Sequence, residues 1–436
     1  MKIGTFNIIN VCSKFIFFIT FGPVGVFMSD VMNFGINFFT EYTNNTLTNY
    51  GLNPIVQSLI INGVFAGVGS VLSFLPIIVI LFFFLSILED SGYMARVAFV
   101  MDKLLRKIGL SGRSFVPMLI GFGCSVPAVM ATRTLENRKD RILTIITVPF
   151  MSCSARIPVY MLLISAFFTK NQGLVLMSIY MLGVVAAIVT SLIVKRISFK
   201  NESDQFVMEL PPYRIPTLRN ALVHMWDKSV QYVKKMGTVI LLATVIIWML
   251  EYFPQHNPQI DGYTARMEQV EADNTLSPAE KENQLKTLEF ERTVCQSENS
   301  YIAKVGKFVA PVFRPLGFDW KMSVSLLTGV AAKEIVVSSM GVLYHADLDA
   351  DENSSSLQAS LKAQKWTEGK EKGQPVFTPL VAYGYMIFIL LYFPCVAALS
   401  AVFREGGRKW GIFSILYNTS VAWLAAFLIH TVGMLL

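Results

Sequence analysis

Charge is scarce in this sequence. Of its 436 residues, 15% are Asp, Glu, Lys or Arg, whereas 53% are hydrophobic. This balance, with a mean hydropathy of +0.51, excludes a soluble domain of this length, which would need more polar residues to cover its surface. The composition is that of a polytopic membrane protein, and we expect an all-α fold.

Other features are missing as well. The five cysteines, Cys12, Cys124, Cys153, Cys295 and Cys395, include no CxxC pair and no spacing typical of a disulfide framework. The sequence has no GxxxxGK[ST] phosphate-binding loop, so GTP hydrolysis cannot be assigned to these residues. The formal net charge is +7, but the basic residues lie in short loops between apolar segments, where they set membrane orientation. No nucleic-acid partner is expected.

Long apolar runs are abundant. A helix of about 20 residues crosses a bilayer, and we expect seven spanning segments. They are Phe15–Phe39, Val56–Leu88, Ile142–Phe168, Gly173–Val194, Gly237–Leu250, Val376–Phe403 and Ile412–Leu436. Two further apolar stretches, Ser114–Thr132 and Met322–Tyr344, are interrupted by small residues, proline or charge.

Loop charges predict that Ser114–Thr132 enters the membrane and returns. Basic side chains outnumber acidic ones on both of its flanks, at 96–113 and 133–141. The positive-inside rule places both flanks in the cytoplasm. Because its two ends then lie on one side, this segment cannot span, and Gly121–Pro127 would form the tip of a re-entrant hairpin.

The stretch Met322–Tyr344 gives the mirrored result. The acidic region 259–300 is expected outside, and the basic loop Arg404–Lys409 inside. Only one full crossing, Val376–Phe403, separates them, so Met322–Tyr344 should re-enter from the outer face. One half dipping from each side makes an inverted repeat, which is typical of alternating access. The alternative is that Met322–Tyr344 simply spans the membrane with a buried Lys-Glu pair.

The two halves also resemble each other in sequence. The stretch Tyr93–Ala131 aligns without a gap on Tyr301–Ser339, at a constant offset of 208 residues (301 − 93). Each copy follows an apolar helix ending in Leu-Glu and precedes an apolar segment interrupted by Pro and Cys. The identical pairs are Tyr93/Tyr301, Ala95/Ala303, Val97/Val305, Arg106/Arg314, Gly109/Gly317, Val116/Val324, Leu119/Leu327, Gly121/Gly329 and Val129/Val337.

Three of the broken membrane segments carry a cysteine. Cys124 lies in Gly121–Pro127, Cys153 lies in Pro149–Pro158, and Cys395 follows Pro394. Non-helical backbone inside a bilayer is tolerated only where protein or water satisfies its polar groups, so broken segments usually line a cavity. The pattern predicts a polar site shared by the three thiols.

Thiol chemistry narrows the substrate of such a site. Sulfur ligands prefer soft or borderline cations such as Zn²⁺, Cu⁺ and Fe²⁺ over Mg²⁺ or Ca²⁺, and a thiol that binds a metal loses its proton. The three membrane cysteines are therefore candidate metal ligands. Ionisable residues at membrane depth are costly and usually functional, although Glu89 and Asp90 could equally be ordinary helix ends. Candidates for the path or gate are Ser125, Met151, Ser152, Ser154, Glu89, Asp90, Lys333 and Glu334.

Several of these runs resemble one known family. Leu88–Arg96, Gly121–Pro127, Pro149–Pro158 and Ala331–Glu334 look like the membrane domain of bacterial ferrous iron transport protein B (FeoB), and the similarity extends from about Phe15 onward. The resemblance implies two gate modules and Fe²⁺ uptake across the inner membrane into the cytoplasm. It also implies that Cys124, Cys153 and Cys395 match the membrane cysteines of the family.

The domain organisation expected on this basis has four parts. Residues 1–54 would hold a first transmembrane helix and an outer loop, and 196–235 a cytoplasmic linker. The first gate repeat would be 55–195, and the second 236–436, with extracytoplasmic insertions at 254–300 and 345–375. Both insertions read as surface loops, apart from a helical stretch near Leu276–Val294.

The family normally begins with a GTP-binding domain, which is not encoded here. The resemblance therefore implies a transporter rather than an enzyme, with GTP bound by a missing or separate domain. Further partners would be membrane lipid, accessory proteins of the ferrous iron system and other copies of the chain. Two alternatives stay open: a nucleoside or other small-solute transporter with the same gates, and a membrane anchor for a separate GTPase.

Overall fold

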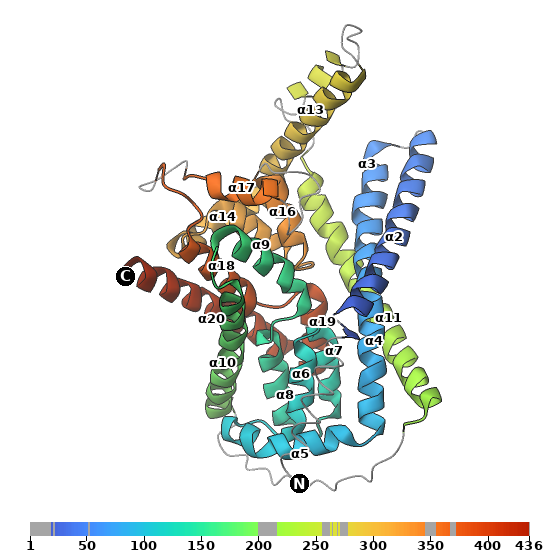
Figure 1. Cartoon of the computed structure of the whole chain (residues 1–436), viewed down its shortest axis with the longest axis vertical. Helices are drawn as coiled ribbons and strands as arrows, with labels where there is room; N and C mark the ends of the chain where they lie inside the picture. Colours follow the sequence, from blue (N-terminus) through green and yellow to red (C-terminus); the bar gives the residue numbers. More distant parts are fainter. Residues whose placement is uncertain are drawn as a thin grey trace. The chain divides into compact units, whose positions relative to one another are not determined.

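The computed structural model describes residues 19–20, 22–50, 53–198, 216–254, 262–263, 265–267, 269–270, 278–344, 355–366 and 372–435 (Figure 1). These residues are helical, apart from turns and an isolated bridge between Lys365 and Pro375, so the all-α expectation is confirmed. The longer helices are α2 (Pro23–Asn49), α4 (Ala66–Asp90), α5 (Tyr93–Leu105), α8 (Arg138–Thr147), α9 (Ile157–Phe167), α10 (Gln172–Ser198), α11 (Leu218–Tyr252), α13 (Pro278–Asn299), α14 (Tyr301–Phe313), α18 (Pro379–Leu391), α19 (Val396–Gly406) and α20 (Arg408–Leu435). The shorter ones are α3 (Pro54–Ser58), α6 (Phe115–Gly121), α7 (Ser125–Ala131), α15 (Trp320–Thr328), α16 (Ile335–Leu343) and α17 (Ser355–Ala363), joined by the π turn η1 (Leu59–Phe65) and the 3₁₀ turns η2 (Arg106–Ile108), η3 (Gly112–Ser114), η4 (Thr132–Thr134), η5 (Val148–Phe150), η6 (Ser154–Arg156) and η7 (Arg314–Leu316).

Six helical segments in the described part of the chain are long and apolar enough to cross a membrane. Each corresponds to one of the expected spans, which confirms a multi-pass membrane protein. The remaining expectation, Phe15–Phe39, lies partly outside the described residues, and its described part belongs to α2. The six segments are Pro54–Asp90, Arg138–Phe167, Gln172–Ser198, Leu218–Tyr252, Pro379–Gly406 and Arg408–Leu435.

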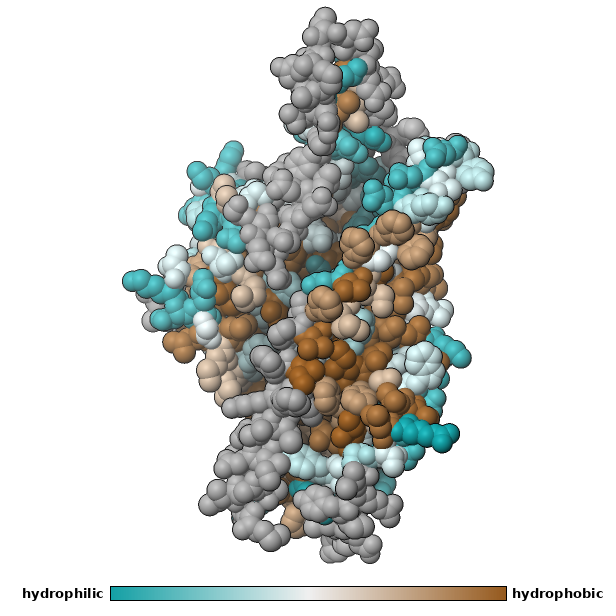
Figure 2. All heavy atoms as spheres, turned by 45° about the vertical axis from the view of Figure 1, so that its right-hand side comes forward, coloured by the Kyte–Doolittle hydropathy of each residue, from teal (hydrophilic) through white to brown (hydrophobic). Residues whose placement is uncertain are grey.

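Large apolar side chains are exposed along these helices. Phe27, Phe34 and Phe38 on α2 and Val68 on α4 lie on the surface. Figure 2 shows hydrophobic residues gathered over the side where α2 and α4 lie, with hydrophilic residues toward both ends of that band. An apolar band of this kind suits contact with lipid chains, since exposed apolar patches on soluble proteins are small.

The chain forms two compact units, which are described separately. The first comprises Met1–Ser154, Gly183–Val245 and Val396–Ile415, and the second comprises Ala155–Leu182, Ile246–Cys395 and Leu416–Leu436. The chain passes from one unit to the other within each of the two Pro-containing broken segments, after Ser154 and after Cys395. The first unit thus combines α6 and α7 with the half-helices α8 and α19, and the second combines α15 and α16 with α9 and α18.

The sequence repeat recurs in local structure. Helices α5 and α14 begin and end at positions that the 208-residue offset makes equivalent, and the 3₁₀ turns η2 and η7 follow them. Both turns end at a glycine with left-handed backbone, Gly109 with φ 88° and Gly317 with φ 78°. Only glycine adopts this conformation without steric cost, which explains why both copies retain it. The inverted orientation of the two copies stays a prediction.

Each copy continues into a pair of short helices that pack against each other, α6 with α7 and α15 with α16. The helices α15 and α16 have nine residues each, far short of the ~20 that cross a bilayer. A single spanning helix at Met322–Tyr344 is thereby excluded, and the interrupted hairpins expected at both places are present.

Equivalent residues close the base of both hairpins. In the first unit, Arg113 forms an ion pair with Glu136 at 2.7 Å. In the second, Lys321 stands at the position equivalent to Arg113, and its ammonium donates to the carbonyl oxygen of Leu343 at 2.7 Å. Each contact ties the start of a hairpin to its end, so both tips are held by the same device.

Some segments expected to be loops are helical. The expected outer loop of 1–54 is largely part of α2, where the hydroxyls of Thr40, Thr43 and Thr46 donate to carbonyls four residues earlier instead of interrupting the helix. Likewise, α11 begins at Leu218, inside the expected linker 196–235.

The two insertions also contain helices. The helical stretch expected near Leu276–Val294 is present as α13. In the insertion 345–375, α17 packs on α9 and buries Leu357 and Leu361 completely, which corrects its interpretation as a surface loop. These two leucines are four residues apart and share one helix face. A single pair of this kind is too short a pattern to predict a helix from hydrophobic periodicity.

Replacing Gly317 by alanine should destabilise the protein. The added methyl group would lie 2.7 Å from Nε2 of His430 and 3.0 Å from Cγ2 of Val381, and a left-handed backbone costs a non-glycine residue about 1–2 kcal/mol. We expect thermal unfolding of the purified protein in detergent to shift down by several degrees. The matched control is Gly384→Ala in α18 of the same unit, where no atom lies within 4 Å of the new methyl group. Equal melting temperatures for the two variants would contradict the argument.

Candidate functional site

The first break separates α6 from α7. The amides of Gly123 and Cys124 both donate to the carbonyl oxygen of Ile120, at 2.9 and 3.0 Å, and so close the end of α6. Cys124 is extended, with φ −148° and ψ 130°, and α7 begins after it. Pro127 lies in the first turn of α7, where its missing N–H leaves no helical bond unmade. The break therefore places a half-buried thiol at the start of α7.

The break after α8 contacts this first break. The amide and the hydroxyl of Ser154 both donate to the carbonyl oxygen of Gly123, each at 3.1 Å. Cys124 follows Gly123 and Cys153 precedes Ser154, so these two bonds bring both cysteines to one place, which we call the Gly123–Ser154 junction. Both cysteine side chains are half-buried.

One buried hydroxyl at the junction, that of Ser152, makes no hydrogen bond within the described residues. The Ser152 side chain is 1% exposed. Buried hydroxyls are normally paired, so this one has room for an exogenous donor or acceptor. Met151 is equally buried, and a methyl group added at Gly121 would lie 3.2 Å from its Cβ. The absence of a side chain at Gly121 thus permits the close approach of the two breaks.

The second unit repeats this pairing of breaks with different groups. Residues 329–334 separate α15 from α16, and Tyr392–Cys395 separates α18 from α19. The ammonium of Lys333 lies 3.2 Å from the centroid of the Tyr392 ring and donates to the carbonyl oxygen of Phe393 at 3.3 Å. Lys333 is 3% exposed. Cys395, two residues beyond Phe393, is half-buried.

The structure thus gathers some of the candidate residues and separates others. Cys124, Cys153, Ser152 and Ser154 are together in the first unit, with Ser125 buried next to Cys124 at the start of α7. Cys395, Lys333 and Glu334 belong to the second unit. Across the described ranges, no three His, Cys, Asp or Glu side chains gather into a metal site. A cation at the first-unit junction would therefore need hydroxyl or carbonyl oxygen besides sulfur.

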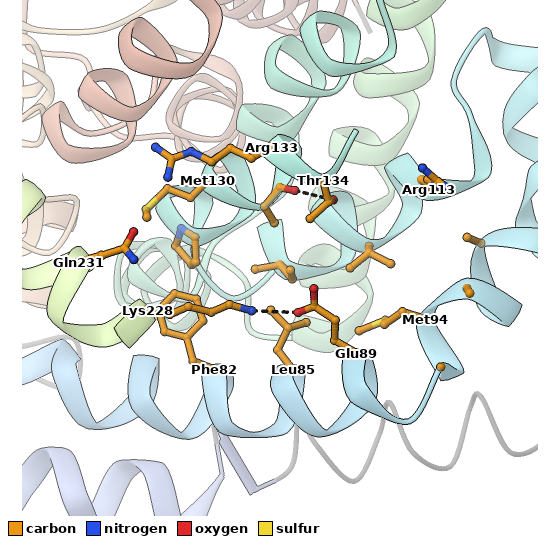
Figure 3. A pocket seen from close by; sticks show the side chains of 17 residues that line it. Phe82, Leu85, Glu89, Met94, Arg113, Met130, Arg133, Thr134, Lys228 and Gln231 are labelled. Atoms are coloured by element: carbon orange, nitrogen blue, oxygen red, sulfur yellow. Dashed lines mark hydrogen bonds and ion pairs between the residues drawn. The ribbon is translucent and has the colours of Figure 1, made fainter. Parts of the chain in front are cut away.

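The first unit also holds a cavity of about 640 Å³ between α4, the start of α5, the α6–α7 hairpin and α11 (Figure 3). Glu89, a candidate gate residue, lies at its edge and forms an ion pair with Lys228 of α11 at 2.9 Å. Asp90 is next to it, and its buried Oδ2 has no hydrogen-bond partner in the part of the chain that is described. The other lining residues are Phe82, Leu85, Gly92, Met94, Ala95, Ala98, Arg113, Val116, Ile120, Pro127, Met130, Ala131, Arg133, Thr134 and Gln231.

Sequence reasoning missed a carboxylate beside this cavity. The side chain of Glu405, at the end of α19, is only 4% exposed, and it accepts hydrogen bonds from Arg133 at 2.8 Å and Arg141 at 2.9 Å. Hydrogen bonding to Glu405 raises the pKa of the Arg133 guanidinium above its ordinary value. The three residues join the end of the first hairpin to α8 and α19. The sequence signal that could have found this group is a lone acidic residue, Glu405, at the end of an apolar helix. Its partners Arg133 and Arg141 are not next to Glu405 in the sequence.

Removing the Glu405 carboxylate should be more damaging than removing an exposed one. Glu405→Ala would take the anion from Arg133 and Arg141, whose side chains are 38% and 33% exposed. Hydrogen bonds to charged groups contribute about 1.5–3 kcal/mol, and water that reaches both guanidinium groups reduces the loss. The control is Glu136→Ala, whose side chain is 84% exposed in its pair with Arg113 and should contribute about 1 kcal/mol or less. Thermal unfolding in detergent compares the two. Similar shifts would show that the buried pairs do not hold the hairpin.

Two family models match the chain. A model described as Gate, nucleoside recognition, matches residues 71–167 and 233–409. A model described as ferrous iron transport protein B C terminus matches residues 176–228. No solved structure matches.

Curated relatives cover most of the chain. An Fe(2+) transport protein A/Fe(2+) transporter FeoB fusion protein of Porphyromonas gingivalis is 49% identical over 381 residues, 87% of this chain and 44% of the relative. The Fe(2+) transporter FeoB of Staphylococcus aureus is 39% identical over 421 residues, 96% of this chain and 55% of the relative. That of Methanocaldococcus jannaschii is 37% identical over 435 residues, 100% of this chain and 58% of the relative. The chain thus spans about half the length of the curated relatives it matches.

Proposed function

The chain belongs to the FeoB family, whose membrane part it matches, and from this premise we propose that it is the permease through which Fe²⁺ crosses the inner membrane into the cytoplasm. The observation that carries the proposal is the Gly123–Ser154 junction. There Ser154 donates two hydrogen bonds to Gly123, and their sequence neighbours Cys124 and Cys153 carry half-buried thiols. The nearby Ser152 hydroxyl is buried and has no partner among the described residues. This is a polar site inside an otherwise apolar protein.

The donors at the junction suit ferrous iron. Cys124 and Cys153 offer sulfur, which favours borderline cations such as Fe²⁺ over Mg²⁺ and Ca²⁺. Ser152, Ser154 and Ser125 offer hydroxyl oxygen for an ion that keeps part of its water. Metal binding would remove the thiol protons, so the thiolates would balance the charge of the ion. The mixed set can hold Fe²⁺ without trapping it as four thiolates would.

A third thiol lies on the proposed path. Cys395 follows the Pro394 break in the second unit, at the end of a half-helix, and unwound carbonyls and half-helix ends are typical ion sites in transporters. GTP would act through residues outside this chain, either in a longer protein or in a separate subunit. Such a domain, with small accessory proteins, would drive or time the opening of the gates.

A nucleoside or another small organic solute is the second candidate. It is favoured by the description of the Gate model and by the first-unit cavity, whose volume of about 640 Å³ is in the usual range for such ligands. The cavity wall, however, is mostly apolar, with Gln231 and Thr134 as its neutral polar groups. A membrane anchor for a GTPase would explain neither the broken helices nor their thiols.

Uptake measurements separate these functions. The purified chain would be reconstituted in proteoliposomes without oxygen, and the entry of radiolabelled Fe²⁺ measured with Zn²⁺, Mn²⁺ or uridine as competitors. We expect Fe²⁺ entry that uridine does not inhibit. Uridine uptake would favour the second candidate. Fe²⁺ entry that requires an added GTPase would assign gating to a partner, and no uptake with any addition would contradict a transport function.

Each membrane cysteine should be needed for Fe²⁺ entry. We expect Cys124→Ser, Cys153→Ser and Cys395→Ser each to lower initial uptake by about tenfold or more, because even indirect partners of a metal ligand contribute about that much to affinity. The control is Cys295→Ser, a half-buried cysteine in α13 and outside the broken segments, and this variant should transport normally. Normal uptake by all three membrane variants would remove the thiol site.

A further inference from the structure

Lys333 is a charged side chain placed where a membrane protein can least easily hold one. It lies in the tip of the second hairpin, between α15 and α16, and only 3% of it is exposed. A buried ammonium is costly unless nearby groups replace its water. Its position therefore indicates a purpose beyond packing, because an apolar residue would fill the same space at lower cost.

The groups around the ammonium form a cation site. The face of the Tyr392 ring lies 3.2 Å away, measured to its centroid, and the Phe393 carbonyl oxygen lies 3.3 Å away. Aromatic faces and carbonyl oxygens both attract cations. Both residues follow the last residue of α18, Leu391, where the helix dipole places partial negative charge. Pro394, which lacks an N–H, leaves the carbonyls of this end without one helical donor.

The corresponding hairpin tip in the first unit has no such cation. At the 208-residue offset, Lys333 and Glu334 are equivalent to Ser125 and Val126, and Gly121–Pro127 contains no charged residue. The two tips therefore differ by a neighbouring Lys-Glu pair, whereas the first Pro-containing broken segment carries a buried arginine, Arg156. In the second unit, a side chain of the protein thus occupies the place that a transported cation would take.

We propose that Lys333 is a tethered cation that fills the second-unit site when iron is absent and is displaced when Fe²⁺ binds at Cys395 and the Phe393 carbonyl. This inference rests on the proposed function. Two cations cannot occupy the Phe393 carbonyl and the Tyr392 ring face at the same time, since like charges at contact distance repel strongly even in a partly polar medium. Occupation by Lys333 and by iron is therefore exclusive.

Exclusive occupation couples iron to the hairpin. When its ammonium leaves Tyr392 and Phe393, the tip 329–334 loses two contacts that hold it to the end of α18. A ligand shifts a conformational equilibrium only through its different affinity for the two states. Fe²⁺ would have such a difference in affinity, because it would bind the state in which the tip is released and not the state in which Lys333 occupies the site. Lys333 also sets a threshold, since weakly bound monovalent cations would not displace it.

The test uses the 436-residue chain reconstituted in lipid nanodiscs without oxygen. Cys395 is alkylated with a maleimide, and Lys333 is acetylated in parallel samples over a series of Fe²⁺ concentrations. Mass spectrometry of peptides quantifies both modifications. In the wild type we expect Fe²⁺ to lower alkylation of Cys395 and to raise acetylation of Lys333 several-fold over the same concentrations. Unchanged acetylation of Lys333 while Cys395 becomes protected would overturn the proposal.

Variants then measure the competition directly. Lys333→Met removes the charge and retains most of the side-chain length. The Fe²⁺ concentration that half-protects Cys395 should therefore fall by about tenfold or more. Lys333→Arg, which keeps the charge, should stay close to the wild type. The matched control is Lys321→Met, because Lys321 also lies near the rings of Trp320 and Tyr344 and donates to a carbonyl, but at the hairpin base. It should leave the half-protection concentration unchanged.

The outcomes distinguish this inference from the proposed function. If Fe²⁺ protects Cys395 equally in the wild type and in Lys333→Met, the metal site stands and the tethered cation is wrong. If Fe²⁺ protects no cysteine in any sample, the proposed iron site itself fails and the inference with it. If Lys333→Met does not fold, the acetylation of Lys333 in the wild type still decides.

Discussion

The fold depends on one constraint: backbone that leaves a helix inside a bilayer must find its hydrogen bonds within the protein. The first unit meets it with two bonds from Ser154 to the carbonyl oxygen of Gly123. This contact requires the close approach that Gly121 permits against Met151. The exposed Arg113–Glu136 pair links the start and the end of the same hairpin. The backbones of Cys124 and Cys153 are brought close as a consequence, because each is adjacent in sequence to a bonded residue.

The second unit meets the same constraint with a charge. There the carbonyl of Phe393 accepts from the ammonium of Lys333 rather than from a serine. A serine satisfies a carbonyl and leaves the site neutral, whereas a lysine also brings a positive charge that must be compensated, here by the Tyr392 ring and the end of α18. In both units a side chain of one break donates to a carbonyl of the other, but the donor is neutral in the first unit and positively charged in the second. On the proposed function, equivalent positions of a repeat have thus acquired different roles.

The sequence predicted the parts of the fold that depend on local pattern. Apolar length predicted the spans, and the offset of 208 residues predicted two copies whose helices α5 and α14 have equivalent limits. Pro, Gly and Cys placed the breaks correctly. Helix ends were predicted less well: α2 extends to Asn49 because threonine hydroxyls can bond within a helix as readily as they can end one. Partners distant in sequence could not be predicted, since no periodicity relates Ser154 to Gly123, Lys333 to Phe393 or Glu405 to Arg133.

The two breaks differ in which protein groups occupy them, and on the proposed path this difference would affect the order in which they bind a cation. At the first-unit junction, the Ser152 hydroxyl is buried without a partner in the described chain, so on the proposed path it would be available to an arriving cation. In the second unit, the same cation would first have to remove Lys333 from Tyr392 and Phe393. The second break would then bind only a cation whose interactions exceed those of the ammonium. A divalent ion with affinity for sulfur would meet that condition at Cys395, whereas a monovalent ion of equal charge to Lys333 would gain little by replacing it. Selectivity would then arise from competition with a residue of the protein as well as from the ligands themselves.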